Sequence, residues 1–286
     1  MIKKSLNKFI ILIVFSLIIS SFPINNKANA EEIDTTEVVV NEIQQTLEET
    51  LEEENIMVDE FEITTEKLSL TTSLEDASGE VNSVVVEVIP GENYITIFSD
   101  EADELGNIER KEYQVNLEDI QVDEQTFEGT FEDVETGETY SYDSEVGTAS
   151  IAFLIPIGIA MSPAVLTALF HTGAMIIVGG SAYVIATQAK KDKKYSHFAA
   201  TVNKGGVYIG KGLSKSKAVA RIQLKKDTWS TSKNQAKGVA ASANPSGQPI
   251  NEVDKLNGKP KKGYYWHWHP YKRTPKAHAF YGSAVK

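Results

Sequence analysis

The chain has 286 residues, of which 41% are hydrophobic and none is cysteine. This length allows about two domains with a sizeable core, and the lack of cysteine excludes disulfides, thiolate metal sites and cysteine nucleophiles. Residues 31–150 carry 36 Asp and Glu against three Lys and Arg, a net charge of −33, whereas residues 151–286 carry 21 Lys and Arg against four Asp and Glu, a net +17. This asymmetry indicates that the two halves face different partners.

Residues 1–30 have the three parts of a secretory signal peptide. Lysines at positions 3, 4 and 8 precede an apolar run at residues 9–19, and the small residues Ala-Asn-Ala at 28–30 stand just before the acidic block. The apolar run is shorter than the ~20 residues that cross a bilayer as a helix, which favours cleavage after Ala30 over a membrane anchor. The chain is therefore expected to be secreted, and the lack of cysteine suits a Gram-positive bacterium.

Residues 31–148 are predicted to form an acidic, mostly antiparallel β domain with a leading helix. Apolar residues recur at helical spacing through residues 39–51. Shorter alternating runs follow, with turn signals at Pro90-Gly91 and Thr136-Gly137. Strands are expected at residues 61–71, 81–89, 94–98, 111–115, 126–131 and 139–143.

The many carboxylates of this domain admit more than one interpretation. Calcium binding is disfavoured, because no stretch has the spaced ligands of an EF-hand loop. Acidic residues that alternate with apolar ones are typical of the solvated face of a sheet. The alternative is that this surface holds the basic half of the chain by charge complementarity, either as an intramolecular antidote or as a folding aid.

Residues 151–185 form an apolar run with few polar interruptions, followed at once by lysines within residues 190–194. As one helix the run would be about 52 Å long, well beyond the ~30 Å hydrocarbon thickness of a bilayer. Either a helical hairpin turns near His171, or one span of about 20 residues ends near Thr187 after a proline-kinked lead. We expect segment 149–188 to insert into a membrane rather than to form a buried core helix, with the lysines on the cytoplasmic side. Membrane association is thus expected through residues 151–187.

Residues 195–286 are predicted to form a small basic α+β domain. Residues 207–209 (Val-Tyr-Ile) are expected to form a strand, and residues 210–212 (Gly-Lys-Gly) to turn that strand into a basic helix that Ser214 caps. The strongest strand candidate is residues 264–271. The whole chain is accordingly expected to be of the α+β class.

Three histidines near the C-terminus are the strongest candidates for chemistry. Residues two apart on a strand point to the same face, so His267 and His269 are expected to project together, and His278 could return on an adjacent strand. As general acid and base, such imidazoles can deprotonate a ribose 2′-hydroxyl and protonate the leaving oxygen. As metal ligands, three imidazoles leave an open coordination position for a water. The remaining interpretation is an aromatic strand with incidental histidines.

The surrounding cations favour a phosphodiester substrate. RNA is favoured over DNA, because acid–base chemistry at imidazoles uses the 2′-hydroxyl and no acidic metal cluster accompanies the histidines. No metal ligand and no cofactor is therefore assigned. The candidate catalytic residues are His267, His269, His278 and Arg273, and the candidate substrate-binding residues are Lys211, Lys217, Arg221, Tyr271, Lys276 and Tyr281.

Three stretches of the C-terminal region resemble the C-terminal domains of bacterial polymorphic toxins. They are residues 207–212 (VYIGKG), residues 218–221 (AVAR) and above all residues 264–282 (YYWHWHPYKRTPKAHAFYG). This region is similar to a group of secreted toxins of Gram-positive bacteria with an HxHP…HxFYG ending. Many such domains are nucleases, so the resemblance implies roles for the three histidines, and phosphate binding by Arg221 and Arg273.

These features predict a secreted modular toxin whose C-terminal domain cleaves nucleic acid, with RNA favoured. One alternative is a protein that permeabilises membranes through the apolar hairpin, and another is a non-enzymatic binding module for wall polymers or DNA. The expected partners are a nucleic-acid substrate and a target-cell membrane. An immunity protein and a contact between the acidic and basic domains are left open.

Overall fold

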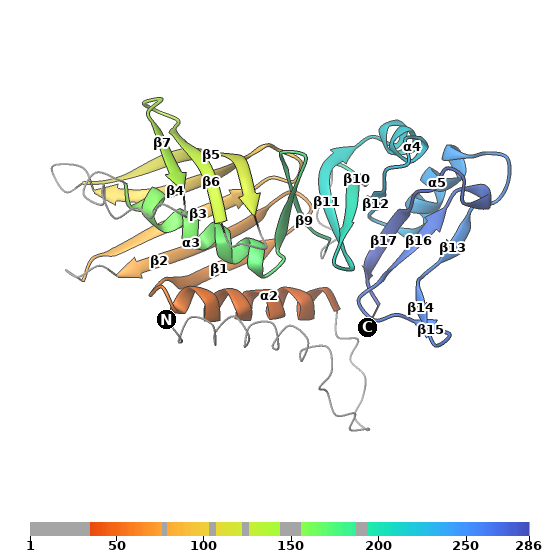
Figure 1. The fold of residues 1–286 in the computed structure, drawn as a ribbon, viewed down its shortest axis with the longest axis horizontal. Coiled ribbons are helices and arrows are strands. Elements are labelled where there is room, and N and C mark those ends of the chain that lie inside the picture. Colours follow the sequence, from red (N-terminus) through yellow and green to blue (C-terminus); the bar gives the residue numbers. More distant parts are fainter. Residues whose placement is uncertain are drawn as a thin grey trace, which may run out of the picture. The chain divides into compact units, whose positions relative to one another are not determined.

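The structure is a computed structural model in which the chain is α+β with mostly antiparallel sheets, as the sequence predicts (Figure 1). The expected signal peptide at residues 1–30 and the lysines at residues 190–193 lie outside the described residues. The structure describes residues 35–75, 79–102, 107–121, 126–143, 156–186 and 194–285.

The first sheet is an antiparallel meander in which each strand pairs with the next along the chain. The expected leading helix is confirmed as α2 (Thr35–Glu52). Short connections and alternating side chains favour such a meander. The strands are β1 (Met57–Ile63), β2 (Leu68–Glu75), β3 (Val81–Val88), β4 (Tyr94–Ala102), β5 (Ile108–Gln121), β6 (Thr126–Asp133) and β7 (Thr139–Asp143).

The strand expected at residues 61–71 is wrong, because a turn divides it between β1 and β2. The Thr64 N–H donates to the Lys67 carbonyl at 2.8 Å, and the Thr64 hydroxyl accepts from the backbone N–H groups of Glu66 and Lys67. A threonine hydroxyl can close such a turn without glycine or proline. The usual turn residues are absent here, so the pattern conceals the reversal of the chain.

Two helices supply apolar side chains to the core beside this sheet. Helix α2 buries Ile43, Leu47 and Leu51, which recur at helical spacing. Helix α3 (Ile157–His171) contacts β3, β4 and β6. Most of its residues are buried, as expected for a helix that is apolar on all sides.

The second half of the apolar segment is not helical, so the expected helical hairpin is wrong, and so is the alternative of one helical span ending near Thr187. Strands β8 (Met175–Val178) and β9 (Ser181–Ile185) form an antiparallel hairpin. Gly179 and Gly180 close the hairpin with φ values of +57° and +73°, a pair of positive angles that favours a type I′ turn. β-Branched residues on both sides favour extended backbone.

Among the helices in the part of the chain that the structure describes, none combines the length and the apolar character needed to cross a membrane.

The second sheet has the strand order β13-β16-β17-β12-β10-β11-β9-β8, so it includes the hairpin of the apolar segment. Strands β12 and β17 are parallel, and the other neighbouring pairs are antiparallel. Helices α4 (Lys215–Gln223) and α5 (Lys233–Ala243) pack against each other and beside this sheet. The remaining elements are β10 (His197–Asn203), β11 (Gly206–Leu213), β12 (Thr228–Ser230), β13 (Ile250–Glu252), β14 (Lys255–Leu256), β15 (Lys259–Pro260), β16 (Tyr265–His269), η1 (Tyr271–Arg273) and β17 (Ala279–Ala284).

The turn expected at residues 210–212 is wrong, because β11 continues as a strand to Leu213. A Cβ atom at Gly210 would lie 2.7 Å from the Tyr183 ring, and one at Gly212 would lie 2.3 Å from the Tyr195 ring. Both glycines therefore permit aromatic rings to lie against the strand. Helix α4 begins directly afterwards, and its expected cap is confirmed, since Ser214 Oγ accepts from the Lys217 N–H at 3.3 Å.

Candidate functional site

The three C-terminal histidines converge on one face of the second sheet. The ring centroids of His267 and His269 are 5.0 Å apart. The His278 ring is 4.9 Å from that of His267 and 4.7 Å from that of His269. We refer to His267, His269 and His278 as the His cluster. Their proximity follows from the two-residue repeat of β16 and from the pairing of β16 with β17.

The opposite face of β16 is packed against helices. Trp268 belongs to an apolar cluster with residues of α4 and α5, including Ile222 and Val239. The ammonium groups of Lys233 and Lys237 lie 5.9 Å and 5.4 Å from the centre of a Trp268 ring. The tryptophan thus anchors the strand to the helices while both neighbouring histidines face the other way.

Each imidazole has one ring nitrogen engaged by a protein acceptor. His267 Nδ1 lies 3.0 Å from the Tyr265 carbonyl oxygen, His269 Nε2 lies 2.8 Å from Glu252 Oε1, and His278 Nδ1 lies 2.9 Å from Asp227 Oδ1. Carbonyl and carboxylate oxygens only accept, so each of these nitrogens donates. In a neutral imidazole the other nitrogen then carries a lone pair.

Register explains why Glu252 belongs to this face. Strand β13 pairs with β16 so that Glu252 lies opposite His267, and directly opposed residues share a face. Asp227 stands just before β12, where its Oδ1 also accepts the His278 backbone N–H at 2.7 Å. The two carboxylates thus reach the His cluster from elements far apart in the sequence.

The cluster is buried at one end and open at the other. His267 and His269 are 3% and 6% exposed, whereas the His278 side chain is 34% exposed. Burial is the main cause that lowers the pKa of both His267 and His269 below the ordinary 6.5. The inner two rings are therefore neutral near pH 7, and solvent reaches the cluster at His278.

Arg273, a candidate catalytic residue, is paired with a protein carboxylate. Its guanidinium donates to Glu252 through both Nε and Nη2. This hydrogen bonding from Arg273 is the first cause that lowers the pKa of Glu252. Glu252 is thus an anion held between the guanidinium and the imidazole of His269.

Arg221, predicted to bind phosphate, is instead engaged with main-chain carbonyls. Its Nε donates to the Asp227 oxygen at 2.7 Å and its Nη2 to the Ala200 oxygen at 3.1 Å. It therefore braces the backbone of the residue whose carboxylate holds His278.

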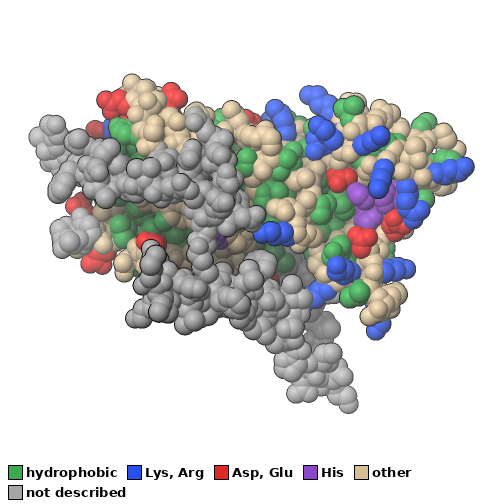
Figure 2. Space-filling model, viewed as in Figure 1, with side chains coloured by type: hydrophobic (Ala, Val, Ile, Leu, Met, Phe, Trp, Pro, Cys, Tyr) green, Lys and Arg blue, Asp and Glu red, His purple; other side chains and the backbone are tan. Residues whose placement is uncertain are grey.

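The other candidate substrate-binding residues lie on separate elements. The Tyr281 hydroxyl lies 3.0 Å from Asn251 Nδ2, and the Tyr271 ring lies against Gly247. Lys211, Lys217 and Lys276 are exposed. Figure 2 shows histidine surface among Lys and Arg side chains, with carboxylates next to it.

Sequence reasoning did not include Asp227 and Glu252 in the site. A signal was present, because only four acidic residues occur among the 136 residues of the basic half. Two of these four contact the His cluster. A carboxylate that is rare in its surroundings was therefore the available clue, although its pairing with a histidine depends on long-range register.

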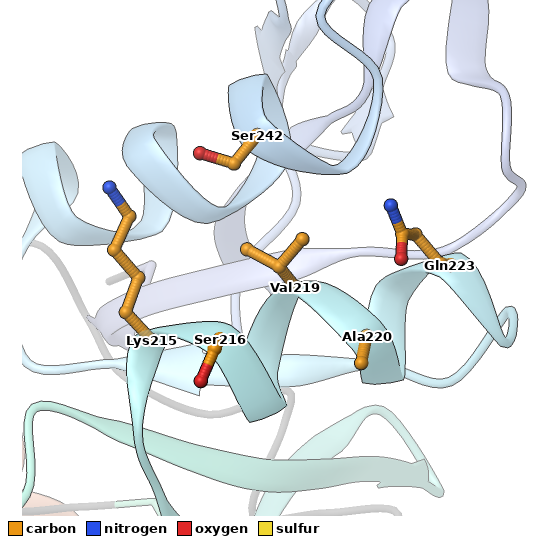
Figure 3. A pocket seen from close by; sticks show the side chains of 6 residues that line it. All are labelled: Lys215, Ser216, Val219, Ala220, Gln223 and Ser242. Atoms are coloured by element: carbon orange, nitrogen blue, oxygen red, sulfur yellow. The ribbon is translucent and has the colours of Figure 1, made fainter.

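A separate hollow lies along helix α4. It has a volume of about 490 Å³, and Figure 3 shows that all its lining side chains except Ser242 come from that helix. Lys215 is the one charged residue in this lining, so the hollow has no acid–base pair. The lining residues are Lys215, Ser216, Val219, Ala220, Gln223 and Ser242.

No family model matches this chain, and neither a curated protein nor a solved structure matches it. What defines the candidate site is its own geometry. The chain is an α+β protein in which one sheet carries three imidazoles with two carboxylates beside them.

Proposed function

We propose that residues 195–286 carry the toxic activity of a secreted bacterial protein, and that this region cleaves nucleic acid at the His cluster. The observation that carries the proposal is the convergence of three imidazoles at a position open to solvent through His278. The basic half has a net charge of +17, which favours a polyanionic substrate.

The chemistry available to the cluster suits a phosphodiester. The hydrogen bond from His278 Nδ1 to Asp227 leaves a lone pair on Nε2 of the partly exposed ring, which can accept a proton from an attacking hydroxyl. Lys276 is exposed two residues from His278, so its ammonium is a candidate to neutralise a phosphate oxygen. RNA is the favoured substrate because its 2′-hydroxyl is a nucleophile within the substrate itself.

Delivery is part of the same proposal. A signal peptide at residues 1–30 would export the chain, and segment 149–188 would enter a target membrane. For that entry, α3 would have to leave its buried position beside the first sheet. When the chain is added to liposomes, we expect a trapped dye to be released if segment 149–188 inserts into the membrane, and to be retained if it does not.

The activity is tested by producing the chain from residue 31 onwards inside a bacterium and following the integrity of RNA and DNA. We expect RNA to be degraded, and degradation to be lost in His278→Ala. His171→Ala, outside the cluster, is the matched control and should retain it. Intact RNA and DNA with the unsubstituted chain would refute the proposal. Degradation of DNA alone would show that the substrate is DNA and not RNA.

A further inference from the structure

In the His cluster, one nitrogen of each neutral ring donates a hydrogen bond, and the other nitrogen carries a lone pair that can bind a metal ion. His267 and His278 each commit Nδ1 to an acceptor, and His269 commits Nε2. The remaining nitrogen of His269, Nδ1, is buried and has no hydrogen-bond partner among the described residues. A buried polar atom without a partner costs free energy, and a bound cation would remove that cost.

We infer that the His cluster binds a transition-metal ion of the Zn²⁺ type. One nitrogen from each of the three rings lies within 4.8 Å of the other two. Three imidazoles are a ligand set that Zn²⁺ takes in hydrolytic sites, with the fourth position left to water. This binding does not depend on which substrate the domain acts on, so it goes beyond the proposed nuclease function. A bound ion would use the ring lone pairs, so its water would take the place of the imidazole base.

The nitrogens need only a modest closure to reach a metal. Zn–N bonds of about 2.0–2.1 Å in a tetrahedral site place ligand nitrogens about 3.4 Å apart, against the 4.8 Å limit observed here. His278 has solvent on one side and stands just before β17 begins, so its ring can tilt inward about the hydrogen bond that Asp227 accepts. The two buried rings are held in place by their acceptors.

The groups around the three rings fit a metal site as well. Metal-binding histidines commonly donate their other ring N–H to a carboxylate or a backbone carbonyl, which fixes the tautomer and orients the ring. Asp227, Glu252 and the Tyr265 carbonyl each accept from one nitrogen of a cluster ring, which leaves the second nitrogen of each ring for a metal. The two carboxylates also place negative charge beside the position of the cation.

The donor type selects the metal. Imidazole nitrogen suits Zn²⁺, Co²⁺, Ni²⁺ and Cu²⁺, whereas Ca²⁺ and Mg²⁺ prefer oxygen ligands. A Zn²⁺ with an open position lowers the pKa of a bound water to about 7. In a nuclease, the oxygen of that hydroxide would bond to phosphorus, the bond to the leaving sugar oxygen would break, and that oxygen would take a proton from water. Substrates without a 2′-hydroxyl would then be cleaved too.

The test uses the full chain, freed of metal with a chelator and titrated with Zn²⁺ by calorimetry and with Co²⁺ by visible absorption. We expect one equivalent to bind, with the intense d–d bands of four-coordinate Co²⁺. His278→Gln and His267→Gln should each lower the affinity at least tenfold, whereas the control His171→Gln should not. Near-UV circular dichroism checks that each variant is folded.

Failure to bind either metal, or equal binding by a variant with all three cluster histidines changed to Gln, would overturn the inference. If single variants fail to fold, the unsubstituted chain still decides, because it must bind one equivalent with a four-coordinate spectrum. Metal binding without nucleic-acid cleavage would leave this site standing and remove the proposed function. Cleavage by the metal-free chain, together with failure to bind either metal, would do the reverse.

Discussion

At the scale of single residues, Asp227 links the His cluster to the rest of the sheet. Its carboxylate accepts from both the ring and the backbone of His278, while its carbonyl accepts from Arg221. One residue thus fixes the position of the only cluster ring with substantial exposure. Asp227 is a positioning residue, because it acts through His278.

We expect Asp227→Asn to reduce nucleic-acid cleavage about 10–100-fold, the range found when such supporting partners are removed. An amide keeps an acceptor for the His278 backbone but removes the negative charge beside the imidazole. The measurement is the cleavage rate with purified protein. Glu60→Gln, the same carboxylate-to-amide change at an exposed residue of β1, should leave the rate unchanged, and equal rates in the two variants would contradict the role of Asp227.

At the scale of elements, glycines decide several features that hydrophobic patterns do not reveal. Gly210 and Gly212 continue a strand beneath aromatic rings, whereas Gly179 and Gly180 reverse the chain at positive φ. The same residue type therefore predicts a turn in both places. Only the neighbouring rings distinguish the two cases, and they come from other segments.

The packing at Gly212 can be tested by replacing it with valine. The new Cβ would meet the Tyr195 ring at 2.3 Å, and overpacking of this kind costs roughly 1–3 kcal/mol. We expect a lower free energy of unfolding, measured by urea denaturation. Gly238→Ala is the control, since its Cβ would meet only the end of Lys215 at 3.7 Å and alanine favours a helix by roughly 0.5–1 kcal/mol.

The β8–β9 hairpin makes a different prediction. Gly180 has a φ of +73°, a region that asparagine tolerates and β-branched residues avoid. We expect Gly180→Val to lower the thermal midpoint clearly more than Gly180→Asn does. Equal midpoints in differential scanning calorimetry would argue against this turn and would reopen the helical interpretation of the segment.

At the scale of the whole molecule, histidines outside the cluster link stability to pH. Burial lowers the pKa of His171 and of His197 below 6.5, and His197 Nδ1 lies 2.9 Å from the Ser230 hydroxyl. Below this pH the unfolded chain takes up protons that the folded chain does not. Folding stability is therefore complete above pH 6.5 and falls as the pH drops towards the lowered pKa values.

We expect the urea midpoint to be lower at about pH 5.5 than at about pH 7.5, on either side of the ordinary histidine pKa. His197→Asn, which keeps a polar group for Ser230, should lose less stability over the same interval. A pH dependence identical to that of the unsubstituted chain would show that His197 does not contribute.

The sequence was sufficient where neighbouring residues determine the structure. The apolar spacing of residues 39–51 predicts α2, the alternation at residues 81–89 predicts β3, and Ser214 predicts the start of α4. The two-residue spacing of His267 and His269 predicts that their rings share a face. In each case the residues that decide lie within one turn of helix or a few positions along a strand.

Tertiary structure decided what depends on partners distant in the chain. It turned residues 175–185 into strands of the second sheet. It also brought Asp227 to His278, 51 residues away in the chain, and Glu252 to His269, 17 residues away. Apolar burial is non-directional, so an apolar run does not reveal whether a lipid, a helix or a sheet will cover it. A carboxylate likewise does not reveal its imidazole until strand register places them on one face.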